Sequence, residues 1–263
     1  MHDTNQNNKD IKIQKEVSIV KLFPNLITAL GLCFGLSSIK LAMFGKFELA
    51  VAFLFIAAIL DAFDGGVARM LNAQSQFGEF FDSLSDFVNF GFCPIFITYL
   101  WNLQSVRFFG WYSVLLCVIC MAIRLSRFNS QIALNSANPV RKKFFFGVPA
   151  PASAILICFP LIISFEFDIF NEFIFLHKKI LVLYVTFIAI LTSSTIPTIS
   201  LKSLKIKESI ITPITIILVI FVIALFMEKW KTIIFITPFY LISIPFSYLR
   251  FKKLQKKYNN NLS

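Results

Sequence analysis

The sequence predicts an all-α membrane protein, a polytopic bundle of about eight transmembrane helices. Of the 263 residues, 57% are hydrophobic and only 15% are charged, a balance that soluble domains do not show. A single core of this size cannot bury all 33 Phe residues and the successive apolar runs. Many of these runs reach the roughly 17–25 residues that are needed to cross about 30 Å of hydrocarbon. Lipid therefore replaces water around most of the protein.

Eight apolar segments qualify as spans and divide the chain into four regions. The predicted spans are 22–43, 47–68, 87–104, 108–126, 147–166, 178–199, 209–227 and 231–249. The first six form a predicted core over residues 22–199, and two additional C-terminal spans occupy 200–249. Residues 250–263 are a basic tail, and Gly31 and Gly35 form a G-x-x-x-G pattern that predicts a helix contact for the first span.

The polar N-terminal segment, residues 1–21, carries no sign of a cleaved signal peptide. Ile11, Ile13, Val17 and Val20 recur within it at loosely helical spacing. A basic stretch with such a stripe is typical of a helix that lies in the membrane interface. We expect an interfacial helix before the first span.

The basic residues predict the orientation of the spans. On the side that holds both termini the polar stretches carry 18 of the 25 Lys and Arg residues, and the other side carries 7. The positive-inside rule then places both termini on the cytoplasmic side of the inner (cytoplasmic) membrane. The net charge of +11 is spread over several loops of this face, so that anionic lipid headgroups suffice as its partner and nucleic acid is not needed.

Four acids stand where apolar residues are expected, at the end of the second span and just before the third. Asp61 and Asp64 are three residues apart, and Asp82 and Asp86 are four apart, so each pair projects from one face of its helix. An Asp at the centre of a span costs about 2.5–3.5 kcal/mol, less near the interface. Four carboxylates that converge need a cation between them, and oxygen ligands favour Mg²⁺, Mn²⁺ or Ca²⁺. We therefore expect a divalent metal site at the cytoplasmic face.

Glycines and one arginine accompany the acids. Gly65, Gly66 and Gly78 each cost a helix about 1 kcal/mol relative to Ala, and close approach of a ligand to the backbone explains such residues. Arg69, four residues after Gly65, can pair with a phosphate. The combination is suited to a metal-bound pyrophosphate.

Written as Asp61-x2-Asp64-Gly65-x2-Ala68-Arg69-x8-Gly78-x3-Asp82-x3-Asp86, the segment resembles the signature of the CDP-alcohol phosphotransferases at every fixed position. This resemblance implies an integral membrane enzyme that moves a phosphatidyl group from a CDP-linked lipid to an alcohol and releases CMP. It implies that Asp61, Asp64, Asp82 and Asp86 hold two Mg²⁺ or Mn²⁺ ions, with Asp86 as the base. It also implies that Gly65, Ala68, Arg69 and Gly78 border the CDP group, and that the protein is a homodimer.

Three further stretches resemble the phosphatidylserine synthase branch of bacteria and archaea: Pro24 to Thr28, Arg124 to Asn129, and Phe146 to Ala152. The resemblance implies CDP-diacylglycerol and L-serine as substrates, with Asn25 and Thr28 on the nucleotide side. Serine carries a carboxylate, so its pocket needs a cation, which Arg124 or Arg127 can supply beside Asn129. Both arginines also fit the positive-inside rule alone.

Two alternatives stay open. The same chemistry can act on glycerol 3-phosphate, inositol phosphate or choline, although a phosphorylated acceptor needs more positive charge than two arginines provide. A cation transporter could use the acids as a conduction site, but such sites draw on several spans near the midplane. Here the acids belong to one helix-turn-helix unit at one face.

Overall fold

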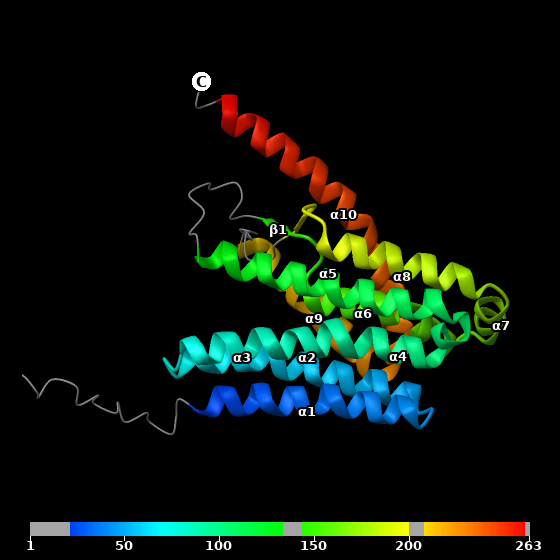
Figure 1. The fold of residues 1–263 in the computed structure, drawn as a ribbon. Coiled ribbons are helices and arrows are strands. Elements are labelled where there is room, and N and C mark those ends of the chain that lie inside the picture. The colour runs from blue at the N-terminus through cyan, green and yellow to red at the C-terminus, as the bar shows by residue number, and fades with distance from the viewer. Residues whose placement is uncertain (1–21, 134–143, 200–207, 261–263) are drawn as a thin grey trace, which may run out of the picture.

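The computed structural model describes residues 22–133, 144–199 and 208–260 and arranges them as one bundle of helices (Figure 1), which confirms the predicted all-α fold. The interfacial helix expected within residues 1–21 lies outside the described residues. The α-helices are α1 (Phe23–Met43), α2 (Phe47–Met70), α3 (Gln76–Asp86), α4 (Cys93–Trp101), α5 (Phe108–Ala133), α6 (Ala150–Ser164), α7 (Asp168–Leu176), α8 (Lys178–Ser193), α9 (Glu208–Met227) and α10 (Lys229–Asn260). A π-helix, Phe87–Phe92, joins α3 to α4, and a 3₁₀ turn, Leu103–Val106, precedes α5.

Helices α1 and α2 form an antiparallel hairpin through a short turn at residues 44–46. The buried face of α1 is a stripe of small or polar residues spaced three and four apart: Pro24, Thr28, Gly31, Gly35, Ser38 and Ala42. A Cβ atom on Gly31 would lie 3.6 Å from the carbonyl oxygen of Ala57 on α2. Small residues allow helix backbones to approach closely in lipid, so the predicted G-x-x-x-G contact is made inside the bundle.

The third span is longer than expected because α3, the π-helix and α4 are continuous from Gln76 to Trp101. The sequence predicted a start at Phe87, since the preceding eleven residues are polar on one face. Cys93, Ile95 and Ile97 of α4 are completely buried in the core. The span therefore has a polar end at α3 and an apolar end that is buried in the core.

Five helices of the described chain are long and apolar enough to cross a membrane, and a sixth span results if the bent pair α6 and α7 counts as one. The bend between α6 and α7 is 113°. Helix α8 is 16 residues long and ends at Ser193, whereas a span was expected to continue to residue 199. Helix α9 forms over 208–227, close to the seventh predicted span. The total of eight spans stays a prediction.

A two-stranded antiparallel ladder was not expected. Strand β1 (Phe144–Phe146) pairs with β2 (Pro197–Ile199), with Phe145 opposite Thr198. Pro197 lacks a backbone N–H and disfavours helix in the residue before it, which explains why the chain after α8 becomes extended. The ladder joins the entrance of α6 to the end of α8.

Residues 250–260 of the predicted basic tail are helical, because α10 continues as one helix to Asn260. No Gly or Pro occurs between Arg250 and Lys257, where Lys, Leu, Gln and Arg favour helix. The end of α10 extends away from the bundle (Figure 1). Near its start, the indole of Trp230 donates a hydrogen bond of 2.8 Å to Glu48 of α2, and Lys229 pairs with the same carboxylate at 3.1 Å.

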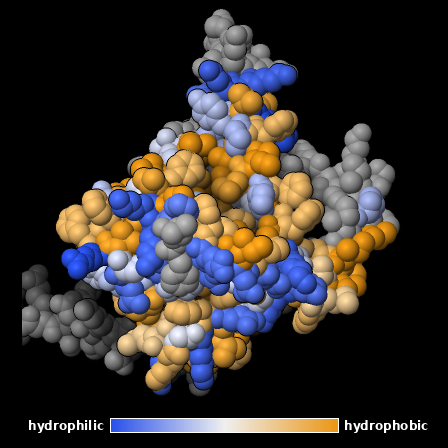
Figure 2. All heavy atoms as spheres, turned by 90° about the vertical axis from the view of Figure 1, so that its right-hand side faces the viewer, coloured by the Kyte–Doolittle hydropathy of each residue, from blue (hydrophilic) through white to orange (hydrophobic). Residues whose placement is uncertain are grey.

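The surface agrees with a lipid environment. Large apolar side chains are exposed on most helices, among them Leu183 at 69% and Phe235 at 69%. Figure 2 shows the end of the bundle that carries the α1–α2 turn and α7, where hydrophilic side chains gather and hydrophobic ones surround them. Polar ends and apolar flanks are what a bundle that spans a membrane requires.

Candidate active site

The two acidic pairs meet because the chain reverses direction between α2 and α3. Asn72 adopts a left-handed conformation with φ 48° just after α2, which Asn tolerates better than most residues. The backbone N–H of Ala73 then donates to the Ala68 carbonyl at 2.9 Å. Ser75 caps α3 by accepting a 3.0 Å hydrogen bond from the backbone N–H of Gly78. The reversal folds the second acidic pair back onto the first, as the sequence predicted.

Asp61, Asp64 and Asp82 converge on one point. One carboxylate oxygen from each residue lies within 4.8 Å of the other two. Asp64 is buried, at 5% exposure, and the other two are half-buried. Three carboxylates this close repel one another strongly in a partly buried setting unless a cation lies among them.

Thr28 of α1 holds one of these carboxylates in place. Its hydroxyl lies 2.5 Å from Oδ2 of Asp64 and 3.1 Å from the Pro24 carbonyl oxygen, and the side chain is 6% exposed. A hydroxyl has one proton, so it donates to only one of these two acceptors at a time. The charged carboxylate is the stronger acceptor. Thr28 therefore fixes the rotamer of Asp64.

Asp86 lies next to Asp61 but outside the group of three. Its Oδ1 atom is buried and has no hydrogen-bond partner among the described residues. A buried polar atom without a partner costs about 1–3 kcal/mol, more when it is charged. This oxygen is available to a ligand or a metal ion.

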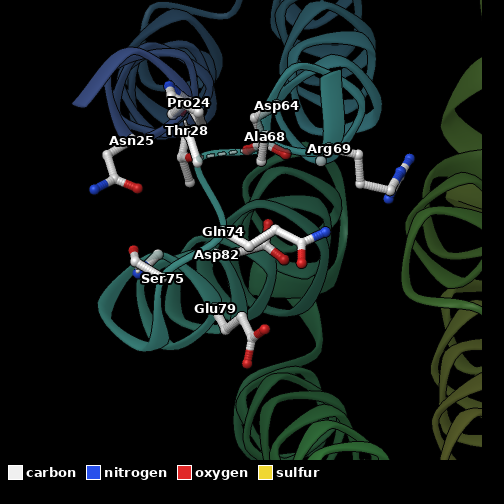
Figure 3. Close-up of a pocket in the computed structure, with 13 residues that line it drawn as sticks. Pro24, Asn25, Thr28, Asp64, Ala68, Arg69, Gln74, Ser75, Glu79 and Asp82 are labelled. Atoms are coloured by element: carbon white, nitrogen blue, oxygen red, sulfur yellow. Dashed lines mark hydrogen bonds between the residues drawn. The ribbon is translucent and has the colours of Figure 1, made fainter. Parts of the chain in front are cut away.

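An open cleft of about 250 Å³ adjoins the carboxylates between α1, α2 and α3 (Figure 3). Figure 3 shows the hydrogen bond between Thr28 and Asp64, with Asp82 on the neighbouring helix. All six residues that the sequence assigned to the nucleotide side line this cleft: Asn25, Thr28, Gly65, Ala68, Arg69 and Gly78. The structure thus brings together residues from three helices that are up to 53 positions apart in the chain.

Gly78 is required by close packing at the cleft. A Cβ atom there would lie 2.9 Å from Oδ1 of Asn25 and 3.1 Å from Oγ of Ser75. The glycine therefore lets α3 approach α1 and leaves both polar side chains at the wall of the cleft. At Gly66, in contrast, a Cβ atom would have no neighbour within 4 Å, so this glycine leaves open space on α2.

The three residues predicted to bind the acceptor lie on α5 and do not line this cleft. Arg124 donates from Nε to the Val148 carbonyl at 2.5 Å, and its positive charge is near the carboxylate of Asp86. Arg127 donates to the carbonyl oxygens of Ser193 and Ser194 at the end of α8. Asn129 donates from Nδ2 to the Ser83 hydroxyl at 3.2 Å. Of the three, Arg124 is the one whose charge interacts with an acid of the site.

Sequence reasoning missed several residues of the cleft, notably Gln74, Ser75 and Glu79. Two signals were available. Ser75 before a helix is a typical N-cap residue, and Glu79 precedes Asp82 by three positions, which places both acids on one helix face. Neither residue occupies a fixed position of the motif, so the motif did not point to them.

The donor set suits a hard divalent cation. Carboxylate oxygens are the ligands that Mg²⁺ and Mn²⁺ prefer, and Asp86 offers a further buried oxygen without a partner. The residues present therefore fit a metal site, and the adjacent cleft with Arg69 at its wall can take an anionic group.

Comparison with known proteins agrees with this chemistry. The family model for CDP-alcohol phosphatidyltransferase matches residues 21–191. A CDP-diacylglycerol–serine O-phosphatidyltransferase of Mycobacterium leprae is 33% identical over 228 residues, which cover 87% of this chain and 75% of that protein.

Two further relatives are similar over shorter stretches. An enzyme of the same name from Helicobacter pylori J99 is 38% identical over 170 residues, 65% of this chain and 67% of that protein. The archaetidylserine synthase of Methanothermobacter thermautotrophicus is 29% identical over 174 residues, 64% of this chain and 70% of that protein. The matched region holds the whole acidic motif and the helices that build its cleft, and the chain belongs to the CDP-alcohol phosphatidyltransferase family.

Proposed function

We propose that this protein is an integral membrane enzyme that transfers the phosphatidyl group of CDP-diacylglycerol to the hydroxyl of L-serine, giving phosphatidylserine and CMP. The convergence of Asp61, Asp64 and Asp82 beside a cleft that all six expected nucleotide-side residues line is the observation that carries this proposal. Relatives that are 33% and 38% identical over the aligned residues bear the name of that activity.

The cleft suits the cytidine diphosphate group. Gly65 leaves the backbone of α2 open to it, since a Cβ atom there would meet only the Arg69 side chain, and Arg69 can pair with a phosphate oxygen. Gly78 keeps the polar side chains of Asn25 and Ser75 at the wall of the cleft. The four Asp residues would hold Mg²⁺ or Mn²⁺, two ions in our proposal. The metal would supply charge neutralisation of the pyrophosphate and of the departing CMP phosphate.

Asp86 is the proposed general base. Its unpartnered buried oxygen can accept the proton of the serine hydroxyl. The hydroxyl oxygen then forms a bond to the phosphorus that carries the diacylglycerol, and the bond from this phosphorus to the bridging oxygen breaks. The electron pair leaves with CMP, so that one phosphate ester replaces one phosphoanhydride.

Arg124 is the proposed partner of the serine carboxylate. Its charge is near that of Asp86, and its terminal amino groups form no hydrogen bond with the described residues, since only Nε is used at Val148. Arg127 is engaged with two backbone carbonyls, and Asn129 with Ser83. We assign these two residues to holding α8 and α3 against α5 beside the acceptor.

The orientation and the assembly belong to the same proposal. With the 18 to 7 distribution of basic residues, the acidic site and both termini face the cytoplasm, where CMP and serine are dissolved. The diacylglycerol chains stay in the bilayer. A homodimer is expected by analogy with the family.

The decisive experiment supplies purified protein with CDP-diacylglycerol, Mn²⁺ or Mg²⁺, and one labelled acceptor at a time: L-serine, glycerol 3-phosphate, inositol phosphate or choline. We expect label in the lipid fraction and stoichiometric CMP with serine alone. Consumption of a phosphorylated alcohol in its place would overturn the serine assignment. Cation uptake into vesicles without CMP release would favour the transporter alternative.

Thr28→Val tests the link between α1 and the metal site. Loss of the hydroxyl that orients Asp64 should raise the Mn²⁺ concentration for half-maximal activity about tenfold, because a partner of a metal ligand contributes 10–100-fold to metal affinity. Thr98→Val is the matched control, since the Thr98 hydroxyl bonds the Pro94 carbonyl at 2.9 Å in the same i to i−4 pattern without a carboxylate. An equal Mn²⁺ requirement in both variants would contradict the proposed role of Thr28.

A further inference from the structure

The last helix brings a polar group to the inner side of the site. Tyr240 lies on α10, outside the 21–191 region that matches the family model. Its hydroxyl oxygen is buried and has no hydrogen-bond partner among the described residues. Nearly all buried hydroxyls in proteins have a partner, so this oxygen needs an explanation.

The position of Tyr240 is fixed by packing. Its ring packs against the core cluster that includes Val148, Leu156 and Ile244, and Ile244, one turn further along α10, is 6% exposed. The carbonyl of Val148 is the group that receives Nε of Arg124. The phenol of α10 and the guanidinium of α5 thus both lie against the core cluster that contains Val148.

Arg124 is near two groups with unmet hydrogen-bonding capacity. Its electrostatic neighbours are Asp86 and Tyr240, together with Arg127. Both Asp86 Oδ1 and the Tyr240 hydroxyl are buried without a partner, and the terminal amino groups of Arg124 form no bond with the described residues. The guanidinium of Arg124 therefore has both an acceptor oxygen and a hydroxyl donor near it.

We propose that Tyr240 completes the acceptor pocket and donates a hydrogen bond to the carboxylate of the amino-acid acceptor, alongside Arg124. This proposal rests on the proposed function and deepens it. An acceptor with a hydroxyl at one end and a carboxylate at the other matches the set: the hydroxyl meets Asp86, and the carboxylate meets Arg124 and Tyr240. The tyrosine thereby selects a carboxylate-bearing alcohol, and α10 has a part in substrate choice.

The geometry also explains why a phenol is suited to this place. A tyrosine hydroxyl donates one bond without adding charge, whereas a second cation would raise the cost of an empty buried pocket. Arg124 supplies the charge, and Tyr240 supplies direction. A site built to bond a polar group discriminates strongly against analogues that lack it, because its own buried groups are then left unpaired.

Tyr240→Phe is the test, with rates measured as a function of L-serine and of L-serinamide, in which a neutral amide replaces the carboxylate. We expect the KM for serine to rise about tenfold, which is about 1.4 kcal/mol. The kcat and the KM for CDP-diacylglycerol should stay within about twofold. The turnover of serinamide should be unchanged, so that the preference for serine over serinamide falls about tenfold.

Tyr184→Phe is the matched control, because the Tyr184 hydroxyl donates to the Leu156 carbonyl at 2.7 Å in the same core cluster. It should lower thermal stability and leave the KM for serine unchanged. An unaltered KM for serine in Tyr240→Phe would overturn the role of Tyr240. So would an equal fall in the turnover of serine and of serinamide. If the wild-type protein does not consume serine, the proposed function is wrong. If the wild type consumes serine and Tyr240→Phe behaves like it, only the role of Tyr240 is wrong.

Discussion

Asp82→Asn is expected to reduce CMP release from CDP-diacylglycerol by at least about 10³-fold. The substitution keeps the size of the side chain and removes the charge from one of three carboxylates whose oxygens lie within 4.8 Å of one another. Loss of one charged oxygen ligand weakens a divalent site and leaves the charge of the departing phosphate less well neutralised. Labelled CMP is measured at saturating Mn²⁺, so that a weaker affinity for the metal is separated from a slower reaction of the metal-bound enzyme.

The same variant should be more stable than the wild type when metal is removed. Without a cation, Asp61, Asp64 and Asp82 repel one another, and an amide at position 82 relieves part of this repulsion. A higher thermal midpoint in EDTA therefore accompanies the loss of activity. Glu79→Gln is the control, since Glu79 lines the same cleft but lies outside the group of three. It should retain activity within about tenfold. Full turnover in Asp82→Asn would remove the metal-site proposal.

Gly110→Ala is expected to lower the free energy of unfolding by about 2–3 kcal/mol, the upper part of the range for overpacking a core. A Cβ atom at Gly110, in the first turn of α5, would overlap the carbonyl oxygen of Leu103 and lie 2.8 Å from its carbonyl carbon. Backbone atoms of a 3₁₀ turn cannot rotate away as a side chain can, and Leu103 itself is completely buried. The start of α5 must therefore shift.

The measurement is thermal or denaturant unfolding of the detergent-solubilised protein. Gly66→Ala serves as the control, because a Cβ atom there meets nothing within 4 Å and the change favours helix by up to about 1 kcal/mol. Equal stability of the two variants would show that the contact between α5 and the turn before it is not tight. Because Arg124 also lies on α5, we expect a shift of this helix in Gly110→Ala to reach the proposed acceptor side as well.

The acidic site was predictable from the sequence because charged side chains are costly next to an apolar membrane span. Carboxylates at the end of an apolar run have few structural explanations, and the spacing of Asp61 with Asp64 and of Asp82 with Asp86 fixes their faces. The turn at Asn72 needs only local information. These contacts join residues that are close in the sequence or that share a helix face, so a single sequence is enough to predict them.

The remaining parts depend on packing between distant segments. Nothing in the apolar run around Tyr240 indicates that its hydroxyl comes near Arg124, 116 residues earlier. The pairing of β1 with β2 joins two short stretches on either side of α6 and α8, which periodicity does not connect. The engagement of Arg127 at the end of α8 distinguishes it from Arg124, although the two look alike in the sequence. The start of the third span also differs from the predicted one, because α3 is polar on one face and still belongs to this span.

The π-helix between α3 and α4 follows Asp86 immediately. A π-turn in an α-helix amounts to one surplus residue, and each residue of an α-helix turns the chain by about 100°. The rotational phase of the stretch that carries Asp82 and Asp86 is thus set separately from that of α4, whose Ile95 and Ile97 are locked in the core. The site therefore requires the number of residues in this segment to be kept as strictly as the acids themselves. A gain or loss of one residue there would rotate both carboxylates away from Asp61 and Asp64 with every ligand still in the sequence.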